Sequence, residues 1–212
     1  NHAENCGGGA FSYGYESMTG TKTTKYIILS FDYCKFIGNV CPSTQETGGG
    51  ALNIDSPETA TISNCIFENN QAKGESYKYG HAIYAAPDSQ ILVQGCTFTN
   101  NGLDDGKDSV IQLAGQDFTF KDSVIQFTDD TKASRGIWMS TPGEMNLINS
   151  HFIKCNSKSE GGAVYYNCSE ATEIEEIITI QGCTFDSCLG SNGLAMLLKI
   201  TNPPTLFNND FI

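Results

Sequence analysis

Apolar and polar residues alternate over short stretches of the chain, as they do between Ile62 and Phe67. β-Branched and aromatic residues dominate the apolar positions, and no apolar run is long enough for a buried helix. An alternation with a period of two is typical of β-strands, whose successive side chains point to opposite faces. The pattern therefore predicts a chain built from short strands.

One phrase occurs seven times: a Gly-Gly-Ala turn, a short apolar strand, a variable insert, and an apolar strand that ends in Cys-x-Phe and asparagines. Its clearest copies begin at residues 49 and 80, and the copies over residues 103–150 are degenerate. The positions equivalent to the cysteine are 34, 65, 96, 123, 150, 183 and 209, separated by 31, 31, 27, 27, 33 and 26 residues. A period of this length predicts a solenoid.

Short strands that recur with this period, with small residues at the corners, predict an all-β fold: a right-handed single-stranded parallel β-helix of about seven coils. We expect a single β-helix domain over residues 1–212. The repeat varies in length within polar stretches such as residues 71–79, where an insertion leaves the stacked strands unchanged. Successive coils pair in register at about 4.8 Å, so equivalent side chains form ladders.

Three ladders are expected. The first two lie two residues apart, so both face the same side of a strand, which we expect to be the interior. The first contains Cys34, Cys65, Cys96 and Cys183, and the second contains Phe36, Phe67, Phe98, Phe152 and Phe185. Three residues after the phenylalanine comes a row of Asn39, Asn70 and Asn101. Asparagine tolerates a left-handed bend and hydrogen-bonds to its counterparts, so we interpret this row as structural rather than ligand-binding.

The nine cysteines allow three roles: disulfide bonding, burial as single thiols, or metal binding. No Cys-x-x-Cys pair occurs, so a structural zinc site lacks its usual signature. The four ladder cysteines are expected to act as small buried hydrophobes.

Two disulfides are predicted at the corners of coils. Cys155 and Cys188 would occupy the outer corner of adjacent coils, within reach of a bridge, and a Cys155–Cys168 bridge is the rival. Cys6 and Cys41 flank successive Gly-rich turns and would join the first two coils.

At this level of detail the chain resembles a known group of repeats. The alternation of Gly-Gly-Ala-(Ile/Leu/Val) with Cys-x-Phe-x-x-Asn is similar to the repeats of the polymorphic outer-membrane proteins of intracellular bacteria and of large protist surface proteins. Both belong to the right-handed β-helix, pectin-lyase-like superfamily. The likeness is strong in residues 48–101 and 161–188 and weak in residues 103–150. It implies an extracellular or cell-surface protein with a structural or adhesive role, and it carries over no catalytic residue.

Composition fits a secreted protein and narrows the partners. The net charge is −12, with only 17% charged residues and 22 glycines. A chain this acidic repels nucleic acid and anionic membranes, and it has no stretch of about 18 uninterrupted apolar residues that would insert into a bilayer. We expect no cofactor. The first residue is Asn1 rather than Met, without a signal peptide, which predicts a processed or truncated chain.

The ends of the predicted solenoid lack polar caps. An uncapped end coil exposes an apolar face and unpaired strand edges. We therefore expect end-to-end self-association, and the alternatives are a slice of a longer β-helix or loops that cover the ends. The residues expected at this interface are Phe11, Leu206, Phe207, Phe211 and Ile212.

The main competing hypothesis is a β-helix that binds or cleaves polysaccharide. A hydrolase needs convergent carboxylates that act as acid and base. The only Asp pairs, at residues 104–105 and 129–130, lack an Asn-Thr-Asp or Gly-His-Gly companion. The single arginine, Arg135, occupies a repeat turn, so Asp129, Asp130 and Arg135 are interpreted as a solvated loop cluster. The histidines at 2, 81 and 151 are too scattered to predict a metal site. We therefore predict no enzymatic activity.

Two surface features bear on partners. Asn167-Cys168-Ser169 is an acceptor sequence for N-glycosylation of Asn167 in a eukaryotic protein, which a disulfide at Cys168 would oppose. Five tyrosines offer an exposed patch for surface carbohydrate or a host protein, although ordinary packing beside strands is the favoured interpretation. These are Tyr77, Tyr79, Tyr84, Tyr165 and Tyr166.

Overall fold

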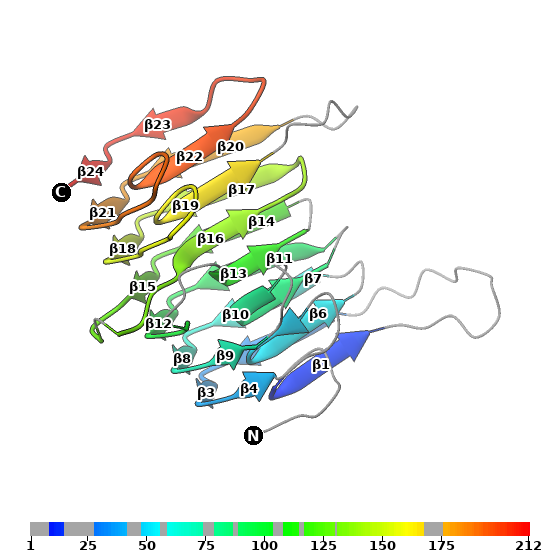
Figure 1. The fold of residues 1–212 in the computed structure, drawn as a ribbon. Helices are drawn as coiled ribbons and strands as arrows, with labels where there is room; N and C mark the ends of the chain where they lie inside the picture. Colours follow the sequence, from blue (N-terminus) through cyan, green and yellow to red (C-terminus); the bar gives the residue numbers. More distant parts are fainter. Residues whose placement is uncertain are drawn as a thin grey trace.

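The computed structural model describes residues 9–14, 28–41, 48–55, 59–73, 79–86, 89–103, 108–114, 117–129, 131–167 and 176–212. Regular secondary structure in these ranges consists of 24 short strands. They form an elongated stack in which the chain winds upward from the blue end to the red end (Figure 1).

Three parallel sheets run along the stack, and the chain visits them in turn on each pass. The first sheet contains β1 (Phe11–Gly14), β6 (Leu52–Asp55), β10 (Tyr79–Ala85), β13 (Ser109–Leu113), β16 (Arg135–Met139), β19 (Val164–Asn167) and β22 (Met196–Lys199), with β5 (Gly48–Gly49) beside β10. The second contains β2 (Ile28–Asp32), β7 (Thr59–Ser63), β11 (Gln90–Gln94), β14 (Asp117–Lys121), β17 (Glu144–Ile148), β20 (Ile177–Gln181) and β23 (Thr205–Phe207). The third contains β3 (Lys35–Ile37), β8 (Ile66–Glu68), β12 (Thr97–Thr99), β15 (Val124–Gln126), β18 (His151–Ile153), β21 (Thr184–Asp186) and β24 (Asp210–Phe211). A further pair joins β4 (Val40–Cys41) to β9 (Gln71–Ala72).

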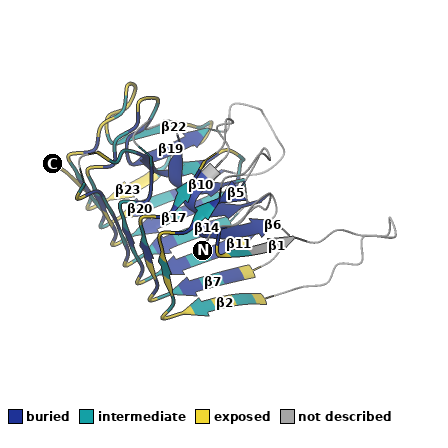
Figure 2. Cartoon of the chain, turned by 60° about the horizontal axis from the view of Figure 1, so that its bottom comes forward, coloured by how far each residue is buried: buried dark blue, intermediate teal, exposed yellow. Residues whose placement is uncertain are grey.

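Each strand pairs in parallel with the equivalent strand of the next pass. Phe36 pairs with Phe67, which pairs with Phe98, so the repeat in the sequence is also the register in space. This arrangement confirms the predicted all-β parallel β-helix. Strands in the middle of the stack are more buried than those at its two ends, such as β2 and β23 (Figure 2).

The interior is filled by columns of apolar side chains, of which the phenylalanine column is the longest aromatic one. Phe67 stacks on Phe98 with ring centroids 4.6 Å apart and an interplanar angle of 5°. On the next pass Ile125 replaces phenylalanine, and Phe120 from the second sheet bridges the interval, 6.0 Å from Phe98 and 5.7 Å from Phe152. The aromatic core is thereby continuous along the described chain.

Two left-handed corners bracket the strand of the third sheet on most passes. The first corner falls at Tyr33, Asn64, Gly95, Asp122, Asn149, Gly182 and Asn208, and the second at Gly38, Asn69, Asn100, Lys154 and Ser187. Their φ angles lie between 48° and 64°, where glycine, asparagine and aspartate are least penalised. The left-handed residue is therefore the one before the asparagine row, which corrects the prediction that the row itself makes the bend.

Tyr33 holds a left-handed conformation with φ of 51° although its side chain is 77% exposed and gains little packing. Tyr33→Gly is therefore expected to raise the free energy of unfolding by about 1 kcal/mol, because glycine pays no steric penalty there. The same change at Ser30, an exposed position within β2, is expected to lower it by a similar amount. Chemical denaturation of both variants measures the sign of each change in the free energy of unfolding. Equal signs would contradict the assignment of Tyr33 to a left-handed corner.

Candidate functional site

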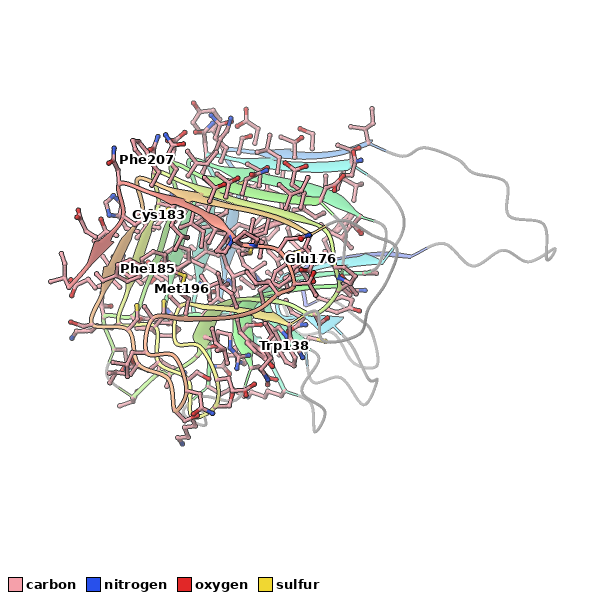
Figure 3. The ribbon with its side chains drawn as sticks, turned by 90° about the horizontal axis from the view of Figure 1, so that it is seen from above. Trp138, Glu176, Cys183, Phe185, Met196 and Phe207 are labelled. Carbon is pink, nitrogen blue, oxygen red and sulfur yellow. The ribbon has the colours of Figure 1, made fainter. Side chains whose placement is uncertain are left out.

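The last pass, formed by β22, β23 and β24, presents apolar side chains at the end of the stack. Leu206 and Phe211 continue inward columns of the second and third sheets, yet they are 51% and 56% exposed. Ile212 follows them and is 78% exposed. Figure 3 shows this end from above, with Phe185 and Met196 within the coil. These three exposed side chains belong to the last pass of the chain.

Of the residues expected at the end-to-end interface, Phe207 lies off the end faces, whereas Phe11 lies at the N-terminal end, which such an interface also includes. Phe207 is 57% exposed, but it belongs to an outward column of the second sheet, in register with Gln181, so it faces sideways (Figure 3). Phe11 lies on β1 at the opposite end, where it is half-buried and packs edge-on against Phe31 with ring centroids 5.2 Å apart. Leu206 and Phe211 are thus the two predicted residues that continue inward columns on the last pass.

Cys65, Cys96 and Cys183 are buried single thiols of the core, as predicted, with Cys34 packed against them, and the column is also joined by hydrogen bonds. The backbone N–H of Cys34 donates to Cys65 Sγ at 3.4 Å, and the N–H of Cys65 donates to Cys96 Sγ at 3.4 Å. The Cys96 thiol in turn lies within donating distance of two carbonyl oxygens, those of Ile62 at 3.4 Å and Gln94 at 3.3 Å. Each sulfur thus satisfies polar backbone groups at a corner.

Other small polar residues take the same role on later passes. Ser123 Oγ accepts from the N–H of Cys96 at 2.9 Å, and Ser150 Oγ accepts from the N–H of Ser123 at 3.3 Å. Asn209 Oδ1 accepts from the N–H of Cys183 at 2.9 Å. The column therefore selects a small side chain that both accepts and donates a hydrogen bond.

Burial raises the pKa of the Cys96 thiol to about 12 from the ordinary value of 9.0. The unfolded chain loses this proton above pH 9 whereas the folded chain retains it, so the contribution to stability is complete below pH 9 and lost as pH rises towards 12. In Cys96→Ser, which keeps the hydrogen bonds, the free energy of unfolding is expected to fall less steeply with pH than in the wild type, by up to about 1.4 kcal/mol per pH unit. Denaturation at pH 8.0 and 10.5 tests this, and identical slopes would contradict it.

The asparagine row forms a buried amide ladder. Asn70 Oδ1 accepts from the backbone N–H of Asn39 at 2.9 Å and from its Nδ2 at 2.8 Å. Asn70 Nδ2 donates to Asn101 Oδ1 and to the carbonyl of Phe36, both at 2.8 Å. In the same way, Asn101 Nδ2 donates to the carbonyl of Phe67 at 2.8 Å. The side chains are at most 4% exposed, so the row joins coils rather than facing solvent.

Cys155 and Cys188 continue this ladder on the inner side of the corner. They are 0% and 7% exposed, and Cys188 Sγ donates to the carbonyl of Phe152 at 3.4 Å, as the asparagines do to their phenylalanines. Burial raises the pKa of Cys155 well above its ordinary value, and a hydrogen bond from the Cys155 thiol lowers the pKa of Cys188.

The predicted disulfides are corrected accordingly. Cys155 and Cys188 are free thiols at an inner corner, not a bridge at an outer one, because their position replaces the inward amide of the asparagine row. Cys41 is buried, and its proposed partner Cys6 and the rival Cys168 lie outside the described residues, so the Cys6–Cys41 bridge stays a prediction.

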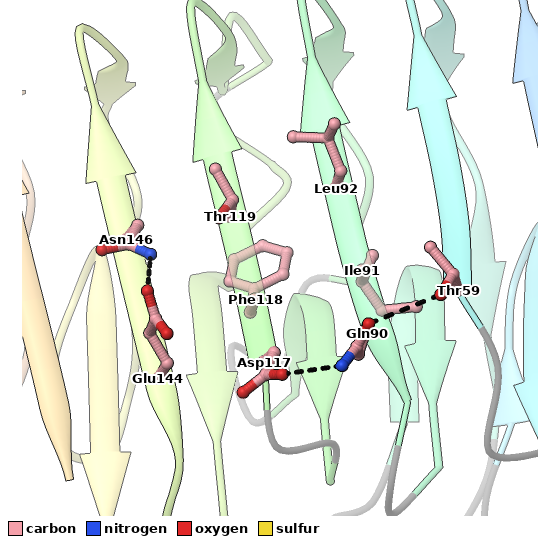
Figure 4. Close-up of a pocket in the computed structure, with 9 residues that line it drawn as sticks. All are labelled: Thr59, Gln90, Ile91, Leu92, Asp117, Phe118, Thr119, Glu144 and Asn146. Carbon is pink, nitrogen blue, oxygen red and sulfur yellow. Dashed lines mark hydrogen bonds between the residues drawn. The ribbon is translucent and has the colours of Figure 1, made fainter.

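A shallow groove lies on the outer face of the second sheet, across β7, β11, β14 and β17, with a volume of about 260 Å³ (Figure 4). Gln90 Nε2 donates to Asp117 Oδ2 at 3.0 Å, and Asn146 Nδ2 donates to Glu144 Oε1 at 2.6 Å. Asp117 and Glu144 are direct partners in the register, so two carboxylates stand on adjacent coils. These two carboxylates are far apart in the chain and belong to no motif, and only an alignment of the strand starts of the repeats brings them together.

Arg135 is buried rather than solvated, which corrects its assignment to a loop cluster with Asp129. Its guanidinium lies between the rings of Trp138 and Tyr165, 5.1 and 4.9 Å from their centroids, and only 2% of the residue is exposed. Nη2 donates to Ser159 Oγ at 2.7 Å, and desolvation lowers the pKa to about 10. Asp129 instead accepts two hydrogen bonds from Thr131 within its own loop, which lower its pKa.

The arginine cluster extends to the outer surface through Tyr165. Lys199 Nζ lies 5.4 Å from the Tyr165 ring centroid and 3.0 Å from Glu160 Oε1. The hydrogen bonds from Tyr165 and Lys199 lower the pKa of Glu160. The arrangement ties the loop that precedes β19 to the outer face of the first sheet.

The remaining predicted surface residues are mostly inside. Tyr84, Tyr165 and Tyr166 are 6%, 6% and 0% exposed, so they form no exposed aromatic patch, in agreement with the packing interpretation. Tyr77, the side chain of Tyr79, Asp130 and His2 lie outside what the structure describes.

The polar residues singled out in the sequence are not brought together. His81 Nδ1 accepts from the N–H of Ala72 at 3.2 Å inside the molecule, whereas His151 is exposed on β18. Asn167 ends β19 and is half-buried. Within the described ranges, no group of three or more His, Cys, Asp or Glu side chains is placed to hold a metal ion. No helix in those ranges is long and apolar enough to cross a membrane.

Comparison with known proteins identifies the family. The model of the right-handed beta helix region matches residues 1–212. No curated protein matches the chain, and no solved structure does. The parallel three-sheet coil described above is the architecture that this family name denotes. The chain therefore belongs to the right-handed β-helix family.

Proposed function

We propose that this β-helix is a non-enzymatic structural or adhesive protein that acts outside the cell and assembles end to end into filaments. The observation that carries the proposal is the set of side-chain ladders that run along the stack, in which phenylalanine, cysteine and asparagine columns connect each coil to the next.

The rest of the molecule suits a stiff rod. Columns of phenylalanine, cysteine and asparagine connect successive coils, and the net charge of −12 keeps the lateral surfaces mutually repulsive. The resemblance of the Gly-Gly-Ala and Cys-x-Phe-x-x-Asn repeats to polymorphic outer-membrane repeats supports a place at the cell surface.

Electron microscopy of the purified 212-residue chain tests this function. We expect filaments with an axial repeat of roughly 34 Å, which is seven passes at about 4.8 Å each. Monodisperse short rods at every concentration would overturn assembly. Secretion of the chain to the cell exterior, followed with a tag, tests its location.

The groove on the second sheet favours a second candidate function, binding or cleavage of a polysaccharide. Asp117 and Glu144 supply adjacent carboxylates, and Gln90 and Asn146 supply amides that bind hydroxyl groups. The groove is smaller than most ligand pockets, which favours weak binding over catalysis. A panel of acidic and neutral polysaccharides, assayed for retention and for new reducing ends, tests it, with Glu144→Gln as the matched variant.

A further inference from the structure

We propose that the groove on the second sheet binds a glycan that carries amino groups, such as an oligomer of glucosamine. This inference rests on the second candidate function above, and it names the class of sugar that the groove would select. The groove lies across β7, β11, β14 and β17, on the outward face of the sheet (Figure 4). The sheet continues on both sides of these strands, through β2 and β20, so the groove does not depend on either end of the stack.

One outward column supplies the polar side chains of the groove. It runs through Ile28, Thr59, Gln90, Asp117, Glu144 and Ile177. The two isoleucines are 77% and 45% exposed, and they bound the polar run on either side. From Thr59 to Glu144 the run covers three steps between coils of about 4.8 Å each, or roughly 14 Å. A site of this length suits an extended oligomer better than a single sugar.

Two like charges face each other within this run. Asp117 and Glu144 are direct partners in the register, and both are half-buried. Like charges at directly facing positions destabilise a sheet. Among the described residues neither carboxylate has a basic partner, and those that line the groove include no lysine, arginine or histidine. A choice that costs stability without a compensating contact is typical of a functional site, and here a cation from outside would remove the repulsion.

The amides beside the carboxylates favour a hydroxylated ligand over a bare metal ion. Gln90 Nε2 donates to Asp117 Oδ2 at 3.0 Å, and Asn146 Nδ2 donates to Glu144 Oε1 at 2.6 Å. Each bond orients an amide and uses one of its two N–H donors, which leaves the second for a sugar hydroxyl. The second oxygen of each carboxylate is then available to an ammonium group, which donates up to three hydrogen bonds. An amino sugar carries both kinds of group on one ring.

The same charges disfavour acidic sugars. A uronate would add a negative charge beside Asp117 and Glu144, in a chain whose net charge is −12. Lys121 is the cation of the same strand, but it lies four residues from Asp117, about 13 Å along β14, so it does not neutralise the groove. We therefore expect affinity to fall in the order amino sugar, neutral sugar, acidic sugar.

Titration calorimetry with three oligomers of equal length tests the proposal. The ligands are hexamers of glucosamine, of N-acetylglucosamine and of galacturonate, at about pH 5.5, where amino sugars are protonated and carboxyl groups are ionised. Only the glucosamine hexamer is expected to bind measurably more tightly as the salt concentration falls. Asp117→Asn and Glu144→Gln each keep the shape of the groove and remove one charge, and each is expected to weaken this binding about two- to fivefold.

A matched control separates recognition by the groove from general attraction to an acidic protein. Glu68→Gln removes one carboxylate from β8 on the third sheet, and it is expected to leave the affinity unchanged. An equal loss for Glu68→Gln and Glu144→Gln would overturn the proposal, and so would equal affinity for a lysine hexamer, since charge alone would then be recognised. The substitutions in the groove relieve a repulsion, so we expect no loss of thermal stability, and circular dichroism checks the fold of each variant.

The results also separate the class of sugar from the function on which it rests. Tighter binding of the N-acetylated or the galacturonate hexamer, weakened by Glu144→Gln, would overturn the preference for amino sugars and leave polysaccharide binding at the groove standing. Absence of binding by all three hexamers would overturn both. Neither result bears on assembly into filaments, which electron microscopy tests separately.

Discussion

Phe98→Ala is expected to lower the free energy of unfolding by about 3–5 kcal/mol, because the ring is fully buried and its loss leaves a cavity in the column. The cost includes two aromatic contacts: the parallel stack on Phe67 at 4.6 Å and the tilted contact with Phe120 at 6.0 Å. Chemical denaturation followed by circular dichroism measures the change.

Phe207→Ala supplies the matched control for this prediction. Its ring is 57% exposed and lies on an outward column, so the same truncation is expected to cost about 1 kcal/mol or less. Equal losses for the two variants would show that the phenylalanine column is not the main source of cohesion between coils. A loss of stability for Phe98→Ala alone would assign the cohesion between coils to the inward phenylalanine stack.

Asn70→Ala is expected to cost about 3–5 kcal/mol, because it removes a side chain that serves both neighbouring passes. Three buried groups would lose the bond that the Asn70 side chain supplies: the backbone N–H of Asn39, Nδ2 of Asn39 and the carbonyl of Phe36. A buried polar group left unsatisfied costs about 1–3 kcal/mol. Thermal and chemical unfolding of the variant measure the loss.

The adjacent asparagine provides the control. Asn69 is exposed and has φ of 54°, a conformation that glycine adopts freely, so Asn69→Gly is expected to change stability by about 0.5 kcal/mol or less. The two asparagines have the same chemistry, and only their places at the corner differ. A large loss at Asn69 with a small one at Asn70 would reverse the assigned roles.

The repeat in the sequence determined the architecture. A period close to 30 residues and an alternation of two predict parallel strands that pair with their own repeats, and the register from Phe36 to Phe67 and Phe98 has that form. The reason is that in-register stacking places identical side chains on one another, so one repeat defines its neighbours.

Only the tertiary structure decided which side chain fills the core where a repeat lacks its phenylalanine. Ile125 interrupts the phenylalanine column, and Phe120 from a different sheet spans the interval between Phe98 and Phe152. Which strands approach each other across the core depends on the angles of the corners, and local sequence pattern carries no such information. The pairing of Asp117 with Glu144 is different, because it lies within one sheet and follows from the register of the repeats.

At the corners the sequence predicts the residue types but not the direction in which each side chain points. Sequence alone determined that small polar residues mark them, but the backbone decided that Asn69 bends while Asn70 bonds. The backbone also turned Cys155 and Cys188 inward, since the column at that position supplies hydrogen bonds to buried carbonyl groups. A residue type is compatible with either face of a corner, and only the assembled coils determine which face has unsatisfied backbone groups.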